Sequence, residues 1–267
     1  MTVAFRASST GVDSAATTTV TCVIPGASQV GDILLAWAST QATPVWTCDT
    51  FAGAPLAPTY TSTRLNLSLP VWVHTIAPGE PGATVTFTSG TTAKRSVAGM
   101  LVLSAAGAVD VQAVSNGSGL SVDCPSVTPG AAHEAIVTLG AISSAVSRTW
   151  SAWAGSVVGP SGGSGSGGSG GVEHACFYNL DYQSVAAPTG TLPLIPTASS
   201  SSWASITLAV SASTPVTRNG ALTLGTIPTL GLIGVNTPIL TNLFYGTPGG
   251  VWKPLNTQGA AIGGVWR

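Results

Sequence analysis

The chain has 267 residues, with 8 basic and 9 acidic side chains, so that only 6 % of the residues are charged. A net charge of −1 excludes a nucleic-acid-binding role that depends on a basic face. The mean hydropathy is +0.43, yet Gly, Pro, Ser and Thr interrupt every apolar run before the ~20 residues that a membrane span needs. Chains with few charges and a net charge near zero tend to associate. We therefore expect a homo-oligomer or assembly with other proteins; the alternative is a surface kept soluble by Ser and Thr hydroxyls.

Short runs of β-branched and apolar residues recur about every ten residues, with Gly, Pro, Asn or Asp between them. The runs are 18–24, 32–38, 66–76, 84–88, 97–104, 135–139, 175–182 and 203–211. This spacing is typical of an all-β sandwich or barrel. We predict a jelly-roll-like antiparallel β-sandwich of eight to ten strands in residues 1–213. The Gly/Ser-rich segment 159–171 is expected to be a flexible loop inserted between strands.

Residues 214–267 are predicted to form a separate C-terminal arm of short strands. Its apolar clusters contain only two or three residues and are too short to bury a core alone. Between Tyr182 and Trp252, the only charged side chain is that of Arg218. The sequence Gly-Gly-Val-Trp-basic occurs at 249–253 and again, fourteen positions later, at 263–267. Aromatic side chains beside a cation are frequent energetic centres of protein interfaces.

We accordingly predict that the arm mediates assembly. Trp252 and Trp266 are the expected anchors, and Lys253 and Arg267 the charges at the periphery of the contact. Phe244 and Tyr245 are also expected to lie in the interface.

Four cysteines, Cys22, Cys48, Cys124 and Cys176, show no spacing suited to zinc. They could form the pairs 22–48 and 124–176 or remain free. The first residues lack the basic and apolar regions of a secretion signal, which favours free buried thiols.

Few ionisable groups could perform chemistry. His74 is expected on the outward face of a strand, and His133-Glu134 at the edge of a turn. Glu173-His174 could meet His133-Glu134 in space, and such a cluster could hold a metal or act as a general base. Nothing in the spacing requires this, so the favoured prediction is a non-catalytic protein without a metal or cofactor.

Trp150 and Trp153 lie close together in the sequence, just before the Gly/Ser-rich segment. They could form an exposed platform on which a glycan stacks. The alternative is that they belong to the core or an interface, where aromatic residues are common.

Several segments resemble a β-sandwich module of tailed bacteriophages, particularly those of actinobacteria. They are Val30–Ala36, Val71–Pro81, 84–88, Ala98–Asp110 and Ser205–Val210. The repeats Gly250-Val251-Trp252-Lys253 and Gly264-Val265-Trp266-Arg267 are similar to Gly-Val-Trp-Lys units near the ends of phage minor tail proteins. The resemblance implies a virion structural component with no catalytic residues.

The leading hypothesis from the sequence is therefore a minor tail protein that is assembled in the host cytoplasm with other virion proteins. The alternatives are a capsid decoration protein and a module that binds a host cell-surface glycan. A cell-wall hydrolase would need a pair of carboxylates, for which Glu134 and Glu173 are the candidates.

Overall fold

The computed structural model describes residues 2–49, 56–90, 93–144, 148–164, 171–197 and 200–213, together with the short strands 244–246 and 252–254. The described chain is all-β and contains no helix, so none of its elements is a helix that could cross a membrane. The predicted all-β sandwich class is thus confirmed. The chain divides into two units, Met1–Val216 and Thr217–Arg267.

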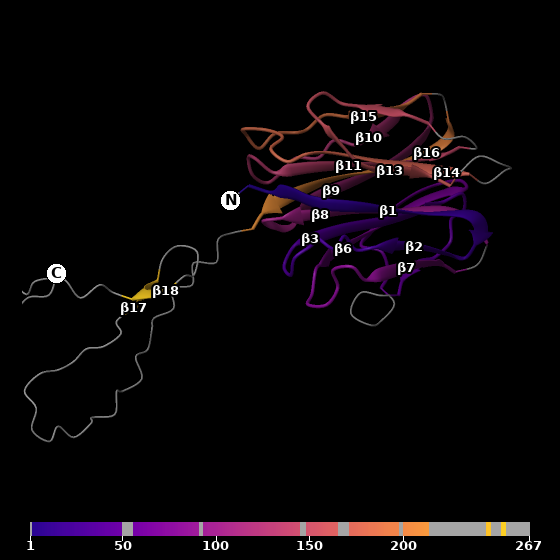
Figure 1. Ribbon diagram of the computed structural model, residues 1–267. Coiled ribbons are helices and arrows are strands. Elements are labelled where there is room, and N and C mark those ends of the chain that lie inside the picture. The colour runs from indigo at the N-terminus through magenta and orange to yellow at the C-terminus, as the bar shows by residue number, and fades with distance from the viewer. Residues whose placement is uncertain are drawn as a thin grey trace, which may run out of the picture. The chain divides into compact units, whose positions relative to one another are not determined.

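The first unit contains sixteen strands (Figure 1). They are β1 (Ala4–Thr17), β2 (Thr19–Val23), β3 (Ile33–Thr40), β4 (Trp46–Cys48), β5 (Tyr60–Arg64), β6 (Leu67–Thr75), β7 (Thr84–Ser89), β8 (Lys94–Ser104), β9 (Ala106–Gly119), β10 (Val122–Cys124), β11 (Ala135–Ser143), β12 (Trp150–Ala152), β13 (Val157–Gly163), β14 (Val172–Asn179), β15 (Leu192–Pro196) and β16 (Ser200–Ala212).

The first eight strands form one sandwich, which we call the first sandwich. Its five-stranded inner sheet has the order β1-β8-β3-β6-β5, and its three-stranded outer sheet has the order β2-β7-β4. All neighbouring strands are antiparallel. Eight antiparallel strands exchanged between two sheets in this way form a jelly roll.

The next eight strands form a second sandwich with the same topology. Its inner sheet is β9-β16-β11-β14-β13 and its outer sheet is β10-β15-β12. Adding eight to the number of each strand of the first sandwich reproduces both orders. The unit is therefore a tandem pair of jelly rolls, and the predicted single sandwich of eight to ten strands is wrong. The strands that the sequence did not reveal are short, such as β4, β10 and β12, or have few buried side chains, such as β9.

The two sandwiches pack back to back, so that four sheets lie in layers (Figure 1). Outer sheets with β2 and β7 on one side and β10 and β15 on the other enclose the two inner sheets. Strand β1 lies over β13, and β9 correspondingly lies over β5. The exchange of equivalent strands across this contact gives the pair an approximate two-fold relation.

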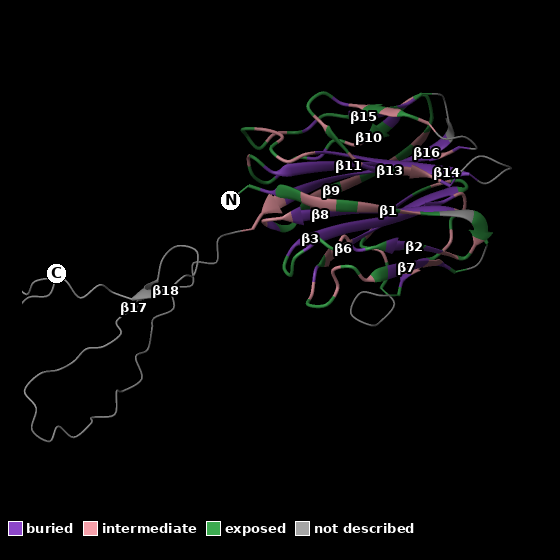
Figure 2. Cartoon of the chain, in the orientation of Figure 1, coloured by how far each residue is buried: buried purple, intermediate pink, exposed green. Residues whose placement is uncertain are grey.

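Three hydrophobic cores fill the spaces between the four layers. The central core joins the two sandwiches through residues such as Leu35 and Trp37 of β3 and Val137 and Leu139 of β11. The alternate residues of β3, Leu34 and Ala36, point instead into the core of the first sandwich. Because both faces of the inner sheets are covered, β3 is buried along its whole length, as Figure 2 shows in purple.

The predicted Gly/Ser loop is partly wrong. Gly159–Gly163 belongs to β13, which pairs with β14 at the edge of the second inner sheet. Glycine is tolerated here because the strand lies closely against its neighbour: a Cβ on Gly159 would lie 3.0 Å from Cys176 Sγ. Residues 165–170 of the predicted loop lie outside the described residues.

In the second unit, the described residues form a two-stranded antiparallel sheet. Strand β17 (Phe244–Gly246) pairs with β18 (Trp252–Pro254), and the register places Tyr245 opposite Lys253. This agrees with short strands in residues 214–267, and the side chains of both strands lie outside the described part of the chain.

Candidate functional site

The first strand of each sandwich contains an irregularity at the same place in the fold. In β1 the register shifts between Phe5 and Ala7, so that Arg6 is the extra residue. In β9 Val109 and Val111 pair with the consecutive residues Val210 and Ala209, which makes Asp110 the extra residue. A bulge turns a side chain out of the regular pattern of the strand. Arg6 and Asp110 therefore occupy equivalent positions with opposite charge.

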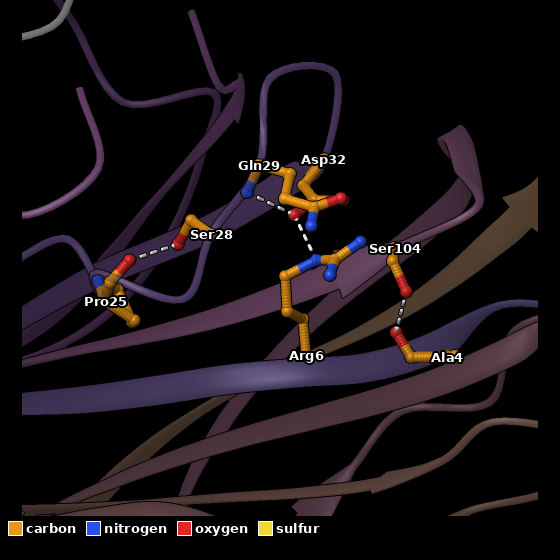
Figure 3. Close-up of polar contacts among 7 residues, drawn as sticks. All are labelled: Ala4, Arg6, Pro25, Ser28, Gln29, Asp32 and Ser104. Carbon is orange, nitrogen blue, oxygen red and sulfur yellow. Dashed lines mark hydrogen bonds and ion pairs between the residues drawn. The ribbon is translucent and has the colours of Figure 1, made fainter. Parts of the chain in front are cut away.

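In the first sandwich this position carries an ion pair (Figure 3). Arg6 Nε lies 2.5 Å from Asp32 Oδ2, and the Asp32 residue is only 5 % exposed. The same carboxylate oxygen accepts a hydrogen bond from the backbone N–H of Gln29 at 2.8 Å. Gly31, with φ of 90°, allows the tight turn that carries Asp32 to the start of β3. The buried carboxylate is thus held by one amide and one guanidinium.

In the second sandwich the same turn precedes β11, but the cation is missing. Glu134 replaces Asp32 and accepts a hydrogen bond from the Ala131 N–H through Oε1 at 3.0 Å. His133, with φ of 62°, takes the place of Gly31. Asp110 replaces Arg6, and its Oδ2 accepts a hydrogen bond from the Gly130 N–H at 2.6 Å. Two adjacent amides therefore bind two carboxylates at a place where the first sandwich has a salt bridge.

The negative charges of Asp110 and Glu134 repel each other, and no cation neutralises them in the described structure. Glu134 is 5 % exposed, and its Oε2 is buried without a hydrogen-bond partner. Burial, and secondly the charge of Asp110, raise the pKa of Glu134 above its usual value, against the hydrogen bond from Ala131. Asp110 lies at the surface. Two neighbouring carboxylates, one buried and one exposed, are a receptor for a cation.

The equivalent positions extend beyond this site. Trp46 of β4 and Trp150 of β12 correspond in register, as do Cys22 and Cys124. Ser104 Oγ donates to the carbonyl oxygen of Ala4 at 3.3 Å. In the second sandwich, Ser211 Oγ donates to that of Ala108 at the same distance.

A repeated Val-x-Cys, at 20–22 and 122–124, is the sequence feature that could have revealed the duplication.

The possible cluster of two histidines and two glutamates does not form. Glu134 immediately precedes the first residue of β11, whereas Glu173 pairs with Ile142 near the end of that strand. At about 3.3 Å per residue, the two lie about 26 Å apart along the strand. Within the described ranges, no group of three or more His, Cys, Asp or Glu is placed to hold a metal.

The three histidines have separate environments. His74 Nε2 lies 2.7 Å from Glu80 Oε2, and His133 Nδ1 lies 2.6 Å from Asp181 Oδ1 at the surface. His174 is completely buried, packs edge-on against Trp37 and has no hydrogen-bond partner for either ring nitrogen. Burial lowers its pKa to about 3, so it is neutral at physiological pH.

Glu173 is a second unusual feature of the second sandwich. The residue is 3 % exposed, and neither carboxylate oxygen has a hydrogen-bond partner. Burial raises the pKa of Glu173 to about 7, although the charge of Arg148, and secondly the backbone of Arg148, act in the opposite direction. The register places Ser68 at the equivalent position of the first sandwich, where its Oγ accepts a hydrogen bond from Trp46 Nε1 at 3.0 Å. The buried polar side chain at this position is thus hydrogen-bonded in the first sandwich, whereas its counterpart in the second sandwich has no hydrogen-bond partner.

Trp150 and Trp153 do not form an exposed pair. Trp153 is 7 % exposed and donates from Nε1 to Thr138 Oγ1 at 3.2 Å. Trp150 is half-buried against the core of the second sandwich, at the position equivalent to the buried Trp46. The two residues therefore agree with the core alternative, since both pack in or against the core of the second sandwich.

All four cysteines are free and buried. The prediction of free thiols is confirmed, and the alternative pairs 22–48 and 124–176 are not present. Burial raises the pKa of Cys22, Cys124 and Cys176 well above that of an exposed thiol.

The predicted assembly residues of the arm are not tested by side-chain geometry. Trp252 and Lys253 lie in β18, and Phe244 and Tyr245 in β17. Their side chains, and the whole of Trp266 and Arg267, lie outside the described residues.

Comparison with known proteins gives no relative. No family model, no curated protein and no solved structure matches the chain. The tandem jelly roll and the two bulge sites are therefore interpreted from their own geometry.

Proposed function

We propose that this chain is a non-catalytic structural protein of a tailed-bacteriophage virion, a minor tail protein that assembles through its weakly charged C-terminal segment. The observation that carries the proposal is the contrast between a closed tandem jelly roll and a segment of 51 residues that repeats an aromatic-basic sequence. The jelly rolls bury their hydrophobic surface in three cores. The repeated Trp-basic sequence supplies the residue types that anchor protein interfaces.

The ionisable groups of the jelly rolls also favour a structural role. Several have a local structural role: the Arg6–Asp32 pair supports a turn, and His74 lies against Glu80. The neutral His174 lies in the central core without a polar partner. A hydrolytic mechanism through Glu134 and Glu173 is incompatible with a separation of about 26 Å, because paired carboxylates act within ~10 Å of each other.

The proposal is tested on purified particles produced from the genome that encodes the chain. Antibody against residues 1–213 is used for immunogold labelling, with particles from a phage lacking the gene as the control. Label on the tail supports a minor tail protein. Label on the capsid moves the assignment to a decoration protein, and intact particles without label in labelling and mass spectrometry overturn the virion proposal.

A further inference from the structure

The charges of the chain are separated between its two units. All nine acidic residues lie in residues 1–216, together with five of the eight basic residues, which gives this unit a net charge of −4. The unit Thr217–Arg267 contains Arg218, Lys253 and Arg267 but no acidic residue, and its net charge is +3. The overall charge of −1 therefore conceals two segments of complementary sign. Such complementarity directs association between copies.

The Asp110–Glu134 pair is the place in the acidic unit where a cation is most clearly missing. Its counterpart in the first sandwich contains the Arg6 guanidinium in direct contact with Asp32. In the second sandwich the Ala131 amide repeats the contact that Gln29 makes with Asp32, and the Gly130 amide adds a contact with Asp110. The guanidinium is replaced by a second carboxylate, and the buried Oε2 of Glu134 has no hydrogen-bond partner. The second sandwich thus has the turn and the buried carboxylate of the first sandwich but has no residue in the place of the Arg6 cation that could neutralise it.

We propose that Asp110 and Glu134 bind the guanidinium of Arg267 from a second copy of this chain, in the position that Arg6 occupies in the first sandwich. This inference rests on the proposed assembly function and identifies the partner of this surface. Asp110 lies at the surface and meets the incoming cation first. Glu134 is buried, as Asp32 is beside the partly exposed Arg6.

A guanidinium fits this site better than a metal ion. Its planar fork donates to two carboxylate groups at once, which neutralises both members of the pair. A hard cation such as calcium requires about six to eight oxygen ligands. In the described residues no third carboxylate, histidine or cysteine completes such a set. Arg267 also follows Gly-Gly-Val-Trp, so that an aromatic side chain adjoins the charge in the same segment.

The decisive variant is Asp110→Arg in the full chain. It restores in the second sandwich the charge that Arg6 supplies in the first, so the protein should remain folded with unchanged or higher thermal stability. Asp49→Arg is the matched control, because it makes the same change of charge at an exposed aspartate of the first sandwich. Self-association is measured by light scattering and sedimentation at increasing protein concentration, at low and high salt.

Wild type is expected to self-associate, and more weakly at high salt. Asp110→Arg and Arg267→Glu should each weaken self-association by about tenfold or more, whereas Asp49→Arg should leave it nearly unchanged. The double variant Asp110→Arg with Arg267→Glu should associate about as weakly as either single variant, because each change alone already removes the contact. This lack of additivity distinguishes a direct contact from a general effect of charge.

The inference is overturned if folded Asp110→Arg associates as strongly as Asp49→Arg, or if the double variant adds the two single losses. A monomeric wild type at all concentrations also overturns it. That result leaves the virion assignment standing if the immunogold label is found on particles, since the C-terminal segment would then contact a different protein. Absence of label with an intact Asp110–Arg267 contact would instead reject the virion assignment alone.

Discussion

The two sandwiches share a topology but differ in how they treat polar groups. In the first, Asp32 is held by Arg6, and Ser68 is satisfied by Trp46. In the second, the charge of Asp110 acts on the buried Glu134, and neither carboxylate oxygen of Glu173 has a hydrogen-bond partner. The two sandwiches therefore have the same strand order but different buried polar contacts. Apolar packing maintains the jelly roll in both copies, and the second copy retains charges that do not favour its own folding.

The close contact of a glycine with a tryptophan distinguishes the central core from the sheet edge. A Cβ on Gly99 would lie 2.4 Å from the Trp37 ring, and one on Gly117 would lie 2.3 Å from the Trp203 ring. Gly99→Val should lower the free energy of unfolding by about 3 kcal/mol, because Trp37 is enclosed between two sheets.

Gly117→Val should cost only about 1 kcal/mol, because β9 is an edge strand and can shift. Urea denaturation measures both variants. Equal losses would contradict the distinction between centre and edge.

The pH dependence of stability should come mainly from the second sandwich. Because the pKa of Glu173 is raised from 4.5 to about 7, the folded protein binds this proton more tightly than the unfolded chain does. The stabilisation is present below pH 4.5 and is lost as the pH rises to about 7, by at most about 3 kcal/mol.

Glu173→Gln should therefore flatten the stability curve between these pH values and raise stability at pH 8. Denaturant titrations at several pH values test this. Ser68→Ala, at the equivalent position of the first sandwich, is the control and should lower stability by about 1 kcal/mol without a change in slope. An unchanged slope in Glu173→Gln would reject the assignment.

The two bulge sites should respond to charge changes in opposite directions. Arg6→Met leaves the Asp32 carboxylate buried without its cation and should destabilise the protein by about 2 kcal/mol. Asp110→Arg supplies a cation to Glu134 and should stabilise it by about 0.5 kcal/mol, a small gain because the position is exposed. Thermal unfolding of the two variants at neutral pH measures the difference. The same sign for both would show that the sites are not equivalent.

The smallest expected difference between the two sandwiches is in the reactivity of their cysteine thiols. All four cysteines are buried, so a thiol reagent should label none of them in the native protein and all of them after unfolding. Cys22, which retains 2 % exposure and contacts Ser9 Oγ at 3.2 Å, should be the first to react in mild denaturant. Mass spectrometry after timed labelling identifies the order. Rapid native labelling of Cys124 or Cys176 would contradict the core assignments.

Sequence analysis predicted the strands with strong apolar patterns, including β3, β7 and β8, because their side chains alternate or are apolar throughout. It did not place Asp110 inside a strand, whereas the structure makes this residue the bulged position of β9. It did not detect the duplication, because equivalent core positions accept different apolar residues, such as Trp37 and Leu139. It also could not predict the bulge sites, since their residues come from distant segments that only strand pairing joins.

By itself, the sequence determined the all-β class, the scarcity of charge and the distinct C-terminal segment, because these properties depend on composition and local periodicity. The tertiary structure decided that strands β1 to β16 form two jelly rolls and that adjacent amides hold Asp110 and Glu134 where the first sandwich pairs Arg6 with Asp32. It also decided that Trp153 faces a core. These relations depend on register and layer packing, which join residues far apart in the sequence and are not encoded in any local pattern.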